Sequence, residues 1–346
     1  SSNYLQSSLA KYYLAHEFVH LITFNQKERL QGTEEDVWLN EARAEYVSTL
    51  LGYDDNYQGS NLQKRVIEFL NNPSDSLTNW NGTPSDYGVL NLFIQYLVDH
   101  YGVKILTDSL HSSKKGIESI NYALEKNGFK EDFSQVFTNW TIAVLANNCS
   151  LAEKYCYKNK NLMNFRIIPE SNLIHSDLPV NLSVNYTLKD WAGVWYKIAG
   201  ESKNLSFEFQ GTSPGNFKVP YVLCDNQNKC LVDFLNLNNN LYTEILIENF
   251  SNKYNSLTII PSSQVNSKLT EGSDNYFFSF EIKNEATNEE ELIKALLIQI
   301  EKLKEEIAKL QAEIDAKWGG AIISCSKIEN NLYYVIKNNP EVQCLQ

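Results

Sequence analysis

Two short segments near the amino end hold residues that together could bind a zinc ion and hydrolyse a substrate. The first is His-Glu-Phe-Val-His at residues 16–20, and the second is Asn-Glu-Ala-Arg-Ala-Glu at residues 40–45. Residues four apart share one face of a helix, so His16 and His20 can hold the same ion while Glu17 points toward its open position. A catalytic zinc takes three protein ligands and keeps a fourth place for water.

The residue types suggest a role for each remaining group. Glu41 is the natural third ligand, because zinc also binds carboxylate oxygen. Its segment opens a second helix with apolar periodicity. Bound zinc lowers the pKa of water to about 7, and Glu17 can take a proton from that water as it attacks a carbonyl. Glu45, one helical turn beyond Glu41, can accept the outer N–H of a ligating histidine. The alternative is two surface helices that carry Glu and His by chance.

The order of these segments resembles the gluzincin metallopeptidases of the thermolysin type. The longer strings that begin at residue 16, His-Glu-Phe-Val-His-Leu-Ile-Thr-Phe-Asn, and at residue 38, Trp-Leu-Asn-Glu-Ala, are more similar to the hyicolysin-type branch of bacterial secreted peptidases. The resemblance covers roughly residues 8–105. It implies that His16, His20 and Glu41 bind zinc, that Glu17 is the general base, and that Glu45 supports a ligand.

The same resemblance implies a β-sheet ahead of the zinc motif. In gluzincins the edge strand of that sheet holds the peptide substrate beside the metal. Only fifteen residues precede His16 in this sequence. We therefore expect a processed or trimmed form in which the upstream sheet is missing.

A donor to the oxyanion is the other group that such a site needs. Tyr87 follows a loop rich in Gly, Pro and Asp and lies at the start of a strongly apolar helix that ends at Gly102. Its hydroxyl could donate a hydrogen bond to the oxyanion, and loss of such a donor typically costs about 3 kcal/mol. The resemblance implies a Tyr or His in this role but does not fix the position. His100 and His111 remain alternatives, as does a tyrosine with a purely structural hydroxyl.

Composition bounds the partners and the number of domains. The chain has 346 residues, of which 43% are hydrophobic, so it can form two or three domains with cores of their own. A net charge of −12 without a Lys/Arg cluster argues against nucleic acid and anionic membranes as partners. No apolar run reaches the length of a transmembrane helix, and no cleavable signal peptide is present.

The cysteines predict disulfides. Six cysteines lack any Cys-x-x-Cys metal spacing, and an extracellular or cell-envelope location follows if they are oxidised. Reduced cysteines in a cytosolic protein are the alternative. Proximity in sequence suggests three local pairs, Cys149 with Cys156, Cys224 with Cys230, and Cys325 with Cys344.

The fold class expected is a multidomain α+β protein. Residues 1–168 read as the mostly helical catalytic lobe of a zincin, and residues 178–286 as an antiparallel β-sandwich, because short period-two strands alternate there with Asn, Gly and Ser turns. Such a module more often binds a ligand or positions another domain than catalyses a reaction. Trp191 and Trp195 could form a ligand platform if exposed, although alternate aromatics on one strand face are more often core.

Residues 288–318 predict a coiled-coil helix. Isoleucine and leucine alternate in a heptad pattern, with Ile293, Ile300, Ile307 and Ile314 at one core position and Leu296, Leu303 and Leu310 at the other. Ile and Leu at these positions favour a parallel dimer, so a homodimer is expected. A trimer, docking onto the sandwich, and a single amphipathic helix packed on its own chain are the alternatives.

The final segment, residues 320–346, resembles the opening of a peptidoglycan-binding-type domain through its string Asn-x-Pro-x-Val-x-x-Leu-Gln from residue 338. That resemblance implies association with the bacterial cell wall.

Taken together, the sequence predicts a secreted or surface-held zinc endopeptidase acting on proteins or peptides. A non-catalytic envelope or adhesion protein with a zincin scaffold, and a peptidase of peptidoglycan stem peptides, are the alternatives. The intact Glu17 favours an enzyme.

Overall fold

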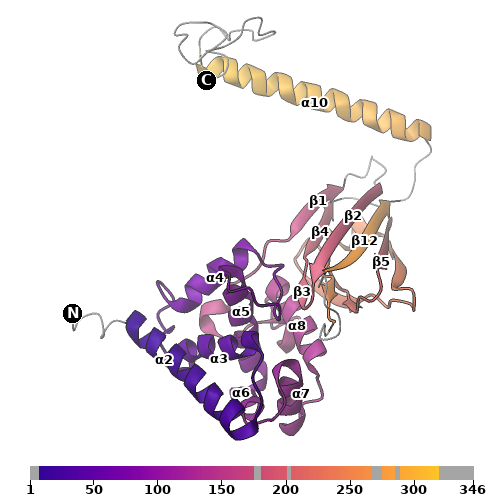
Figure 1. The fold of residues 1–346 in the computed structure, drawn as a ribbon. Coiled ribbons are helices and arrows are strands. Elements are labelled where there is room, and N and C mark those ends of the chain that lie inside the picture. Colours follow the sequence, from indigo (N-terminus) through magenta and orange to yellow (C-terminus); the bar gives the residue numbers. More distant parts are fainter. Residues whose placement is uncertain (1–7, 175–180, 201–203, 266–274, 285–288, 319–346) are drawn as a thin grey trace, which may run out of the picture. The chain divides into compact units, whose positions relative to one another are not determined.

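The chain is a mixed α+β protein that divides into two compact units, residues 1–286 and residues 287–346. The first unit holds a helical lobe followed by β-sheets, and the second holds one long helix (Figure 1). The computed structural model describes residues 8–174, 181–200, 204–265, 275–284 and 289–318. The predicted α+β class is confirmed at this level.

The helical lobe contains α-helices joined by short turns. A π-helical segment, η1 (Phe24–Arg29), continues directly from the first helix, and short 3₁₀ turns lie at Glu153–Tyr155 and Lys160–Leu162. The α-helices are α2 (Ser8–Thr23), α3 (Val37–Leu50), α4 (Asn61–Asn71), α5 (Pro84–Tyr101), α6 (Lys104–Leu110), α7 (Gly116–Lys126) and α8 (Phe133–Ala146).

Helix α5 lies in the core and is delimited by strong local signals. Thr83 and Asp86 form a reciprocal capping box with Pro84 between them, and Gly102 ends the helix with a positive φ of 79°. Most of its residues are buried, because it packs against neighbours on several sides. At Gly88 a Cβ would lie 2.4 Å from the backbone nitrogen of Phe69 in α4, so only glycine allows these helices to pack so closely.

The β-region forms two main sheets and a small third one. One sheet has the strand order β1-β4-β10-β7-β8, another β2-β12-β5-β9, and the small one β3-β11-β6. The strands are β1 (Glu170–Ile174), β2 (Asn181–Lys189), β3 (Ala192–Gly193), β4 (Tyr196–Gly200), β5 (Asn204–Gly211), β6 (Phe217–Lys218), β7 (Pro220–Cys224), β8 (Cys230–Phe234), β9 (Tyr242–Glu248), β10 (Ser256–Ile259), β11 (Ser262–Ser263) and β12 (Asn275–Asn284), with a short helix, α9 (Phe250–Lys253), between β9 and β10.

Aromatic side chains join the two main sheets in one core. Tyr196 of β4 and Phe280 of β12 pack edge to face with ring centroids 5.0 Å apart, and Phe207 of β5 packs on Phe280. Strand β1 precedes the region predicted to be antiparallel, residues 178–286, and pairs parallel with β4, with Glu170 opposite Tyr196. Parallel neighbours need a long crossover, and the chain through β2 and β3 supplies it.

The helical lobe and the sheets are packed together through two tryptophans. The indole nitrogen of Trp195 donates to the carbonyl of Thr141 at 2.9 Å, and Trp191 packs against Phe133 and Phe137 of α8. Both indoles are buried. They are core residues, and the alternative of an exposed ligand platform was wrong because helix α8 covers them.

Two of the three expected disulfides are formed, Cys149–Cys156 and Cys224–Cys230. The third expected pair, Cys325 and Cys344, lies outside the described residues, as does the segment 320–346. Disulfides persist in oxidising compartments, which agrees with an extracellular protein. No helix in the described ranges combines the length and apolarity needed to cross a membrane.

The second unit contains α10 (Glu289–Trp318), which matches the helix predicted from the heptads. Between residues 297 and 314, where its side chains are described, both core positions of the heptad are open to solvent. Ile307, for example, is 64% exposed. An apolar seam of this kind is typical of a helix that packs on a partner.

Candidate metal centre

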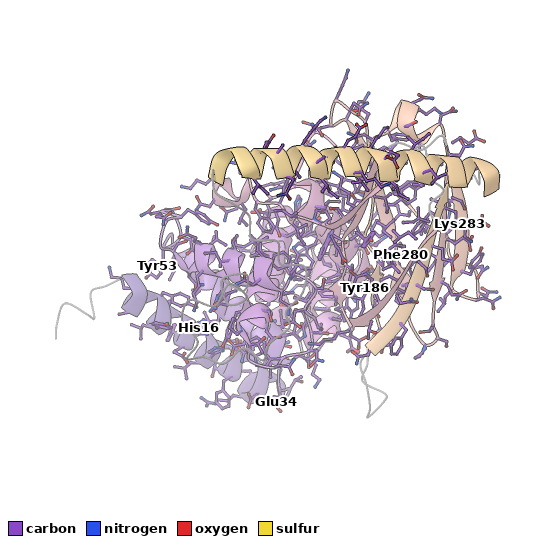
Figure 2. The ribbon with its side chains drawn as sticks, turned by 90° about the horizontal axis from the view of Figure 1, so that it is seen from above. His16, Glu34, Tyr53, Tyr186, Phe280 and Lys283 are labelled. Atoms are coloured by element: carbon purple, nitrogen blue, oxygen red, sulfur yellow. A yellow bond between two sulfur atoms is a disulfide. The ribbon has the colours of Figure 1, made fainter. Side chains whose placement is uncertain are left out.

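His16, His20 and Glu41 are brought together by two packed helices, α2 and α3 (Figure 2 labels His16). Nε2 of His16 lies 3.4 Å from Oε2 of Glu41, and Nε2 of His20 lies 3.6 Å from Oε1 of the same carboxylate. One ligand atom from each residue lies within 4.8 Å of the others. The fold therefore places the three predicted ligands around a single point.

These distances fit a zinc ion better than a direct ion pair. A tetrahedral zinc with bonds of about 2.1 Å holds its ligand atoms roughly 3.4 Å apart. A charged hydrogen bond between imidazolium and carboxylate would be shorter, at about 2.7–2.9 Å. Oε2 of Glu41 is buried and has no hydrogen-bond partner, which costs free energy unless a cation occupies the site.

In both imidazoles, Nδ1 faces away from Glu41 and contacts a polar group that orients the ring. Nδ1 of His20 lies 3.0 Å from Oδ1 of Asn40, an atom that can only accept, so this nitrogen carries the proton and Nε2 keeps its lone pair. Nδ1 of His16 faces the Tyr12 hydroxyl at 3.5 Å and Oε1 of Glu45 at 3.6 Å. Each Nε2 is thus free to bind a metal.

Glu45 is the centre of a buried polar network. Its side chain is completely buried, and Arg65 of α4 binds both oxygens, Nε to Oε2 at 2.7 Å and Nη2 to Oε1 at 2.6 Å. The Tyr12 hydroxyl and the Asn61 amide also donate to it, at 2.6 and 2.8 Å. Burial opposes the charge of Glu45, but the hydrogen bonds and charge of Arg65 hold its pKa below the ordinary value. Glu45 is therefore a carboxylate that acts on His16 together with Tyr12.

Glu17 lies on the open side of α2. Its side chain is exposed, and within the described part of the chain it forms no hydrogen bond or ion pair. Leu14, Phe18 and Leu21 share its face of the helix and are also exposed, Phe18 by 59%. The predicted base therefore stands one residue from His16, on an exposed apolar surface of α2.

Tyr87 lies in the first turns of α5, half-buried between Arg65 and Trp80. The guanidinium carbon of Arg65 is 4.3 Å from the centre of its ring, and the Trp80 ring packs on it edge to face at 4.8 Å. Burial and the negative charge of Glu41 raise the pKa of the Tyr87 hydroxyl, so it stays protonated and can donate.

The two alternative histidines have other surroundings. Nε2 of His100 lies 2.8 Å from the carbonyl of Cys156, and its ring packs on Tyr96. Burial lowers the pKa of His100, so its ring is held neutral as a donor to the disulfide segment. His111 is an exposed residue that follows the last turn of α6. Tyr87 is therefore the better-placed donor of the three.

Three residues of the site carried no role in the sequence analysis. Tyr12 lies four residues before His16, and this spacing on one helix face was a signal that could have found it. Asn40 is part of the second segment, but its contact with His20 becomes visible only when α2 and α3 are packed together. Arg65 reaches the site from α4, and no local pattern links it to Glu45.

Comparisons with known proteins leave the family open. No protein-family model and no curated protein matches the sequence. Similar solved structures include the pre-peptidase C-terminal domain of a collagenase from Bacillus anthracis, with 13% identity over 34% of this chain and 97% of that chain and a TM-score of 0.24. Another is a periplasmic inhibitor of g-type lysozyme from Aeromonas hydrophila, with 10% identity over 34% and 98% of the two chains and a TM-score of 0.20.

A third similar structure is a family GH115 4-O-methyl-α-glucuronidase with specificity for decorated arabinogalactans. It shares 9% identity over 65% of this chain and 33% of that chain, with a TM-score of 0.18. Likenesses this weak support no conclusion about fold or function. The functional proposal therefore rests on the geometry around His16, His20 and Glu41.

Proposed function

We propose that the protein is a zinc-dependent endopeptidase of the gluzincin type, secreted or held at the cell envelope. The observation that carries the proposal is the convergence of His16, His20 and Glu41, in which one buried oxygen of Glu41 has no hydrogen-bond partner among the described residues. Zinc bound there would polarise the peptide carbonyl and acidify the attacking water.

Glu17 and Tyr87 perform the proton transfer and the charge stabilisation in this proposal. Glu17 removes a proton from the water that attacks the carbonyl and then delivers a proton to the departing amine, so that the carboxylate is regenerated. Tyr87 donates its hydroxyl proton in a hydrogen bond to the oxyanion and keeps that proton throughout. The exposed apolar face of α2 beside Glu17 suits the side chains of a protein or peptide substrate.

The proposal requires one zinc ion for each chain. We expect elemental analysis of the purified protein to give this ratio, and we expect Glu41→Gln to weaken zinc binding more than about 100-fold, because it removes a direct ligand. Glu28→Gln, a change at an exposed glutamate of η1, is the matched control and should bind zinc as the wild type does. Equal zinc content in the two variants would contradict the assignment of Glu41.

The exposed seam of α10 supports a second proposal, that the protein is a homodimer. Ile300, Leu303, Ile307, Leu310 and Ile314 form a self-complementary stripe with the heptad period of a two-stranded coiled coil. Two chains would then be joined through α10. Association with the cell wall through residues 320–346 is proposed on the sequence resemblance alone.

Light scattering coupled to size exclusion tests the dimer. We expect the wild type to have about twice the chain mass of 39.7 kDa, and Ile307→Lys to have the mass of a monomer, because a lysine at this position is buried in the seam without a partner. Glu305→Lys, on the opposite face of α10, should leave the dimer intact. A monomeric wild type, or dissociation by both variants alike, would exclude the seam as the interface.

A further inference from the structure

A cavity of about 510 Å³ opens at the amino end of α3. Segments that lie far apart in the sequence form its walls: the residues that begin α3, the loop ahead of α5, the start of α7, and Trp191 and Val265 of the β-region. Figure 2 labels one of the wall residues, Glu34, on the same lobe as His16. The cavity exists because the helical lobe and the sheets are packed as one unit.

The cavity lies one turn of α3 away from Glu41, one of the proposed metal ligands. Val37 lines it and is 50% exposed, and Glu41 follows on the same face of α3 one helical turn later, a rise of about 5–6 Å. Trp80 also lines it, and its ring contacts Tyr87, the proposed oxyanion donor. A peptide held at the metal can therefore reach the cavity with a side chain about one or two residues from the cleaved bond.

The charges around the cavity leave two carboxylates without partners. Glu35 is neutralised by Arg43 at 2.8 Å and Lys27 at 3.3 Å, and Asp36 faces Lys115 at 3.5 Å. Glu34 and Glu118 are exposed at the rim, and in the described residues neither has an ion pair or a hydrogen bond. The rim thus has an excess of negative charge.

The walls below the rim are aromatic. Trp80, Val37 and Ile117, which are at least partly exposed, line the cavity, as do Trp38 and Trp191, whose side chains are almost wholly buried. Indole faces attract cations, and they also pack on the methylene stems of long side chains. An apolar wall with unpaired carboxylates at its edge is complementary to a long side chain with a positive end.

We propose that this cavity is a substrate subsite that binds the side chain of an arginine or lysine near the cleaved bond. The proposal rests on the proposed peptidase function for the meaning of the subsite, but the binding it describes does not require zinc or hydrolysis. The guanidinium or ammonium group would lie beside Glu34 and Glu118, with its stem on Trp80 and the aliphatic side chains.

Binding to the metal-free full chain tests the pocket by itself. Nα-acetyl-arginine amide is titrated into protein treated with a chelator, with tryptophan fluorescence as the readout, and the neutral isostere Nα-acetyl-citrulline amide is the comparison. We expect arginine to bind about tenfold more tightly than citrulline, since each exposed charge pair contributes about threefold. Equal binding of the two, or binding of neither, would overturn the proposal.

Matched variants locate the binding site. We expect Glu34→Gln/Glu118→Gln to reduce arginine affinity to that of citrulline, whereas the control Glu28→Gln/Glu125→Gln, which changes the same charge at exposed positions outside the cavity, should bind as the wild type does. A loss of similar size in the control pair would mean that overall charge, rather than the cavity, attracts arginine, and the proposal would fail.

Peptide hydrolysis separates this proposal from the proposed function. With zinc present, peptides that carry arginine at one position near the cleaved bond should be cut with a higher kcat/KM than citrulline peptides, and the Glu34→Gln/Glu118→Gln pair should remove this preference. Arginine binding without hydrolysis would support the pocket and refute the peptidase. Hydrolysis with no arginine preference would refute the pocket and support the peptidase.

Discussion

Glu17→Gln is expected to lower the rate of peptide hydrolysis between about 100-fold and 10,000-fold while zinc remains bound. Glutamine has nearly the shape of glutamate but cannot take a proton from the attacking water. Glu17 is exposed and has no partner in the described residues, so its replacement leaves the packing of α2 on α3 unchanged. The measurement is kcat/KM on casein or a quenched peptide, with zinc content determined on the same sample.

Tyr87→Phe is the companion variant, because it removes a hydrogen-bond donor and keeps the aromatic ring between Arg65 and Trp80. We expect kcat to fall about 100-fold or more, with little change in KM, since the donor acts on the oxyanion rather than on the bound substrate.

A chelator should abolish the activity of the wild type. Hydrolysis that persists unchanged in Glu17→Gln would show that the base has been assigned to the wrong residue.

The convergence of His16, His20 and Glu41 could be predicted because its signal is local. His16 and His20 are four residues apart on one helix, and Glu41 follows within a short second segment, so helical periodicity alone sets their directions. The residues that hold the ligands in place could not be predicted in the same way. Arg65 reaches Glu45 from another helix, and its position depends on how α4 and α5 pack at Gly88.

The same contrast holds for the fold. Helix α5 was found within a few residues, because capping residues and apolar periodicity agree there. Strand β1 was missed because Glu170, Ser171 and Asn172 lack the alternation of apolar and polar residues that marks a strand. Its parallel pairing with β4 forms only in the folded chain. The cavity beside α3 could not be predicted from the sequence either, since its walls meet only after the sheets pack against the helices.

Arg65→Met is expected to reduce the free energy of unfolding by about 3–5 kcal/mol, because it leaves a buried charge without its partner. Glu45 has a fully buried side chain, and the remaining donors to it, Tyr12, Asn61 and Asn91, carry no charge. Methionine keeps most of the volume of the arginine side chain, so the loss measures the charge pair more than a cavity. Urea denaturation followed by circular dichroism gives the value.

A double-mutant cycle separates the effect of the unpaired Glu45 charge on stability from that of the rest of the hydrogen-bond network. Replacing both residues, as Arg65→Met/Glu45→Gln, removes the unpaired anion, and we expect the double variant to be more stable than Arg65→Met alone by at least about 1 kcal/mol. The same double variant should still bind zinc about 10-fold to 100-fold more weakly than the wild type, because Glu45 no longer holds Tyr12 against His16. Strictly additive losses would show that Arg65 and Glu45 act independently. If instead stability recovers while zinc affinity does not, the Glu45 carboxylate is retained for the metal site, and Arg65 is the residue that allows it to remain charged there.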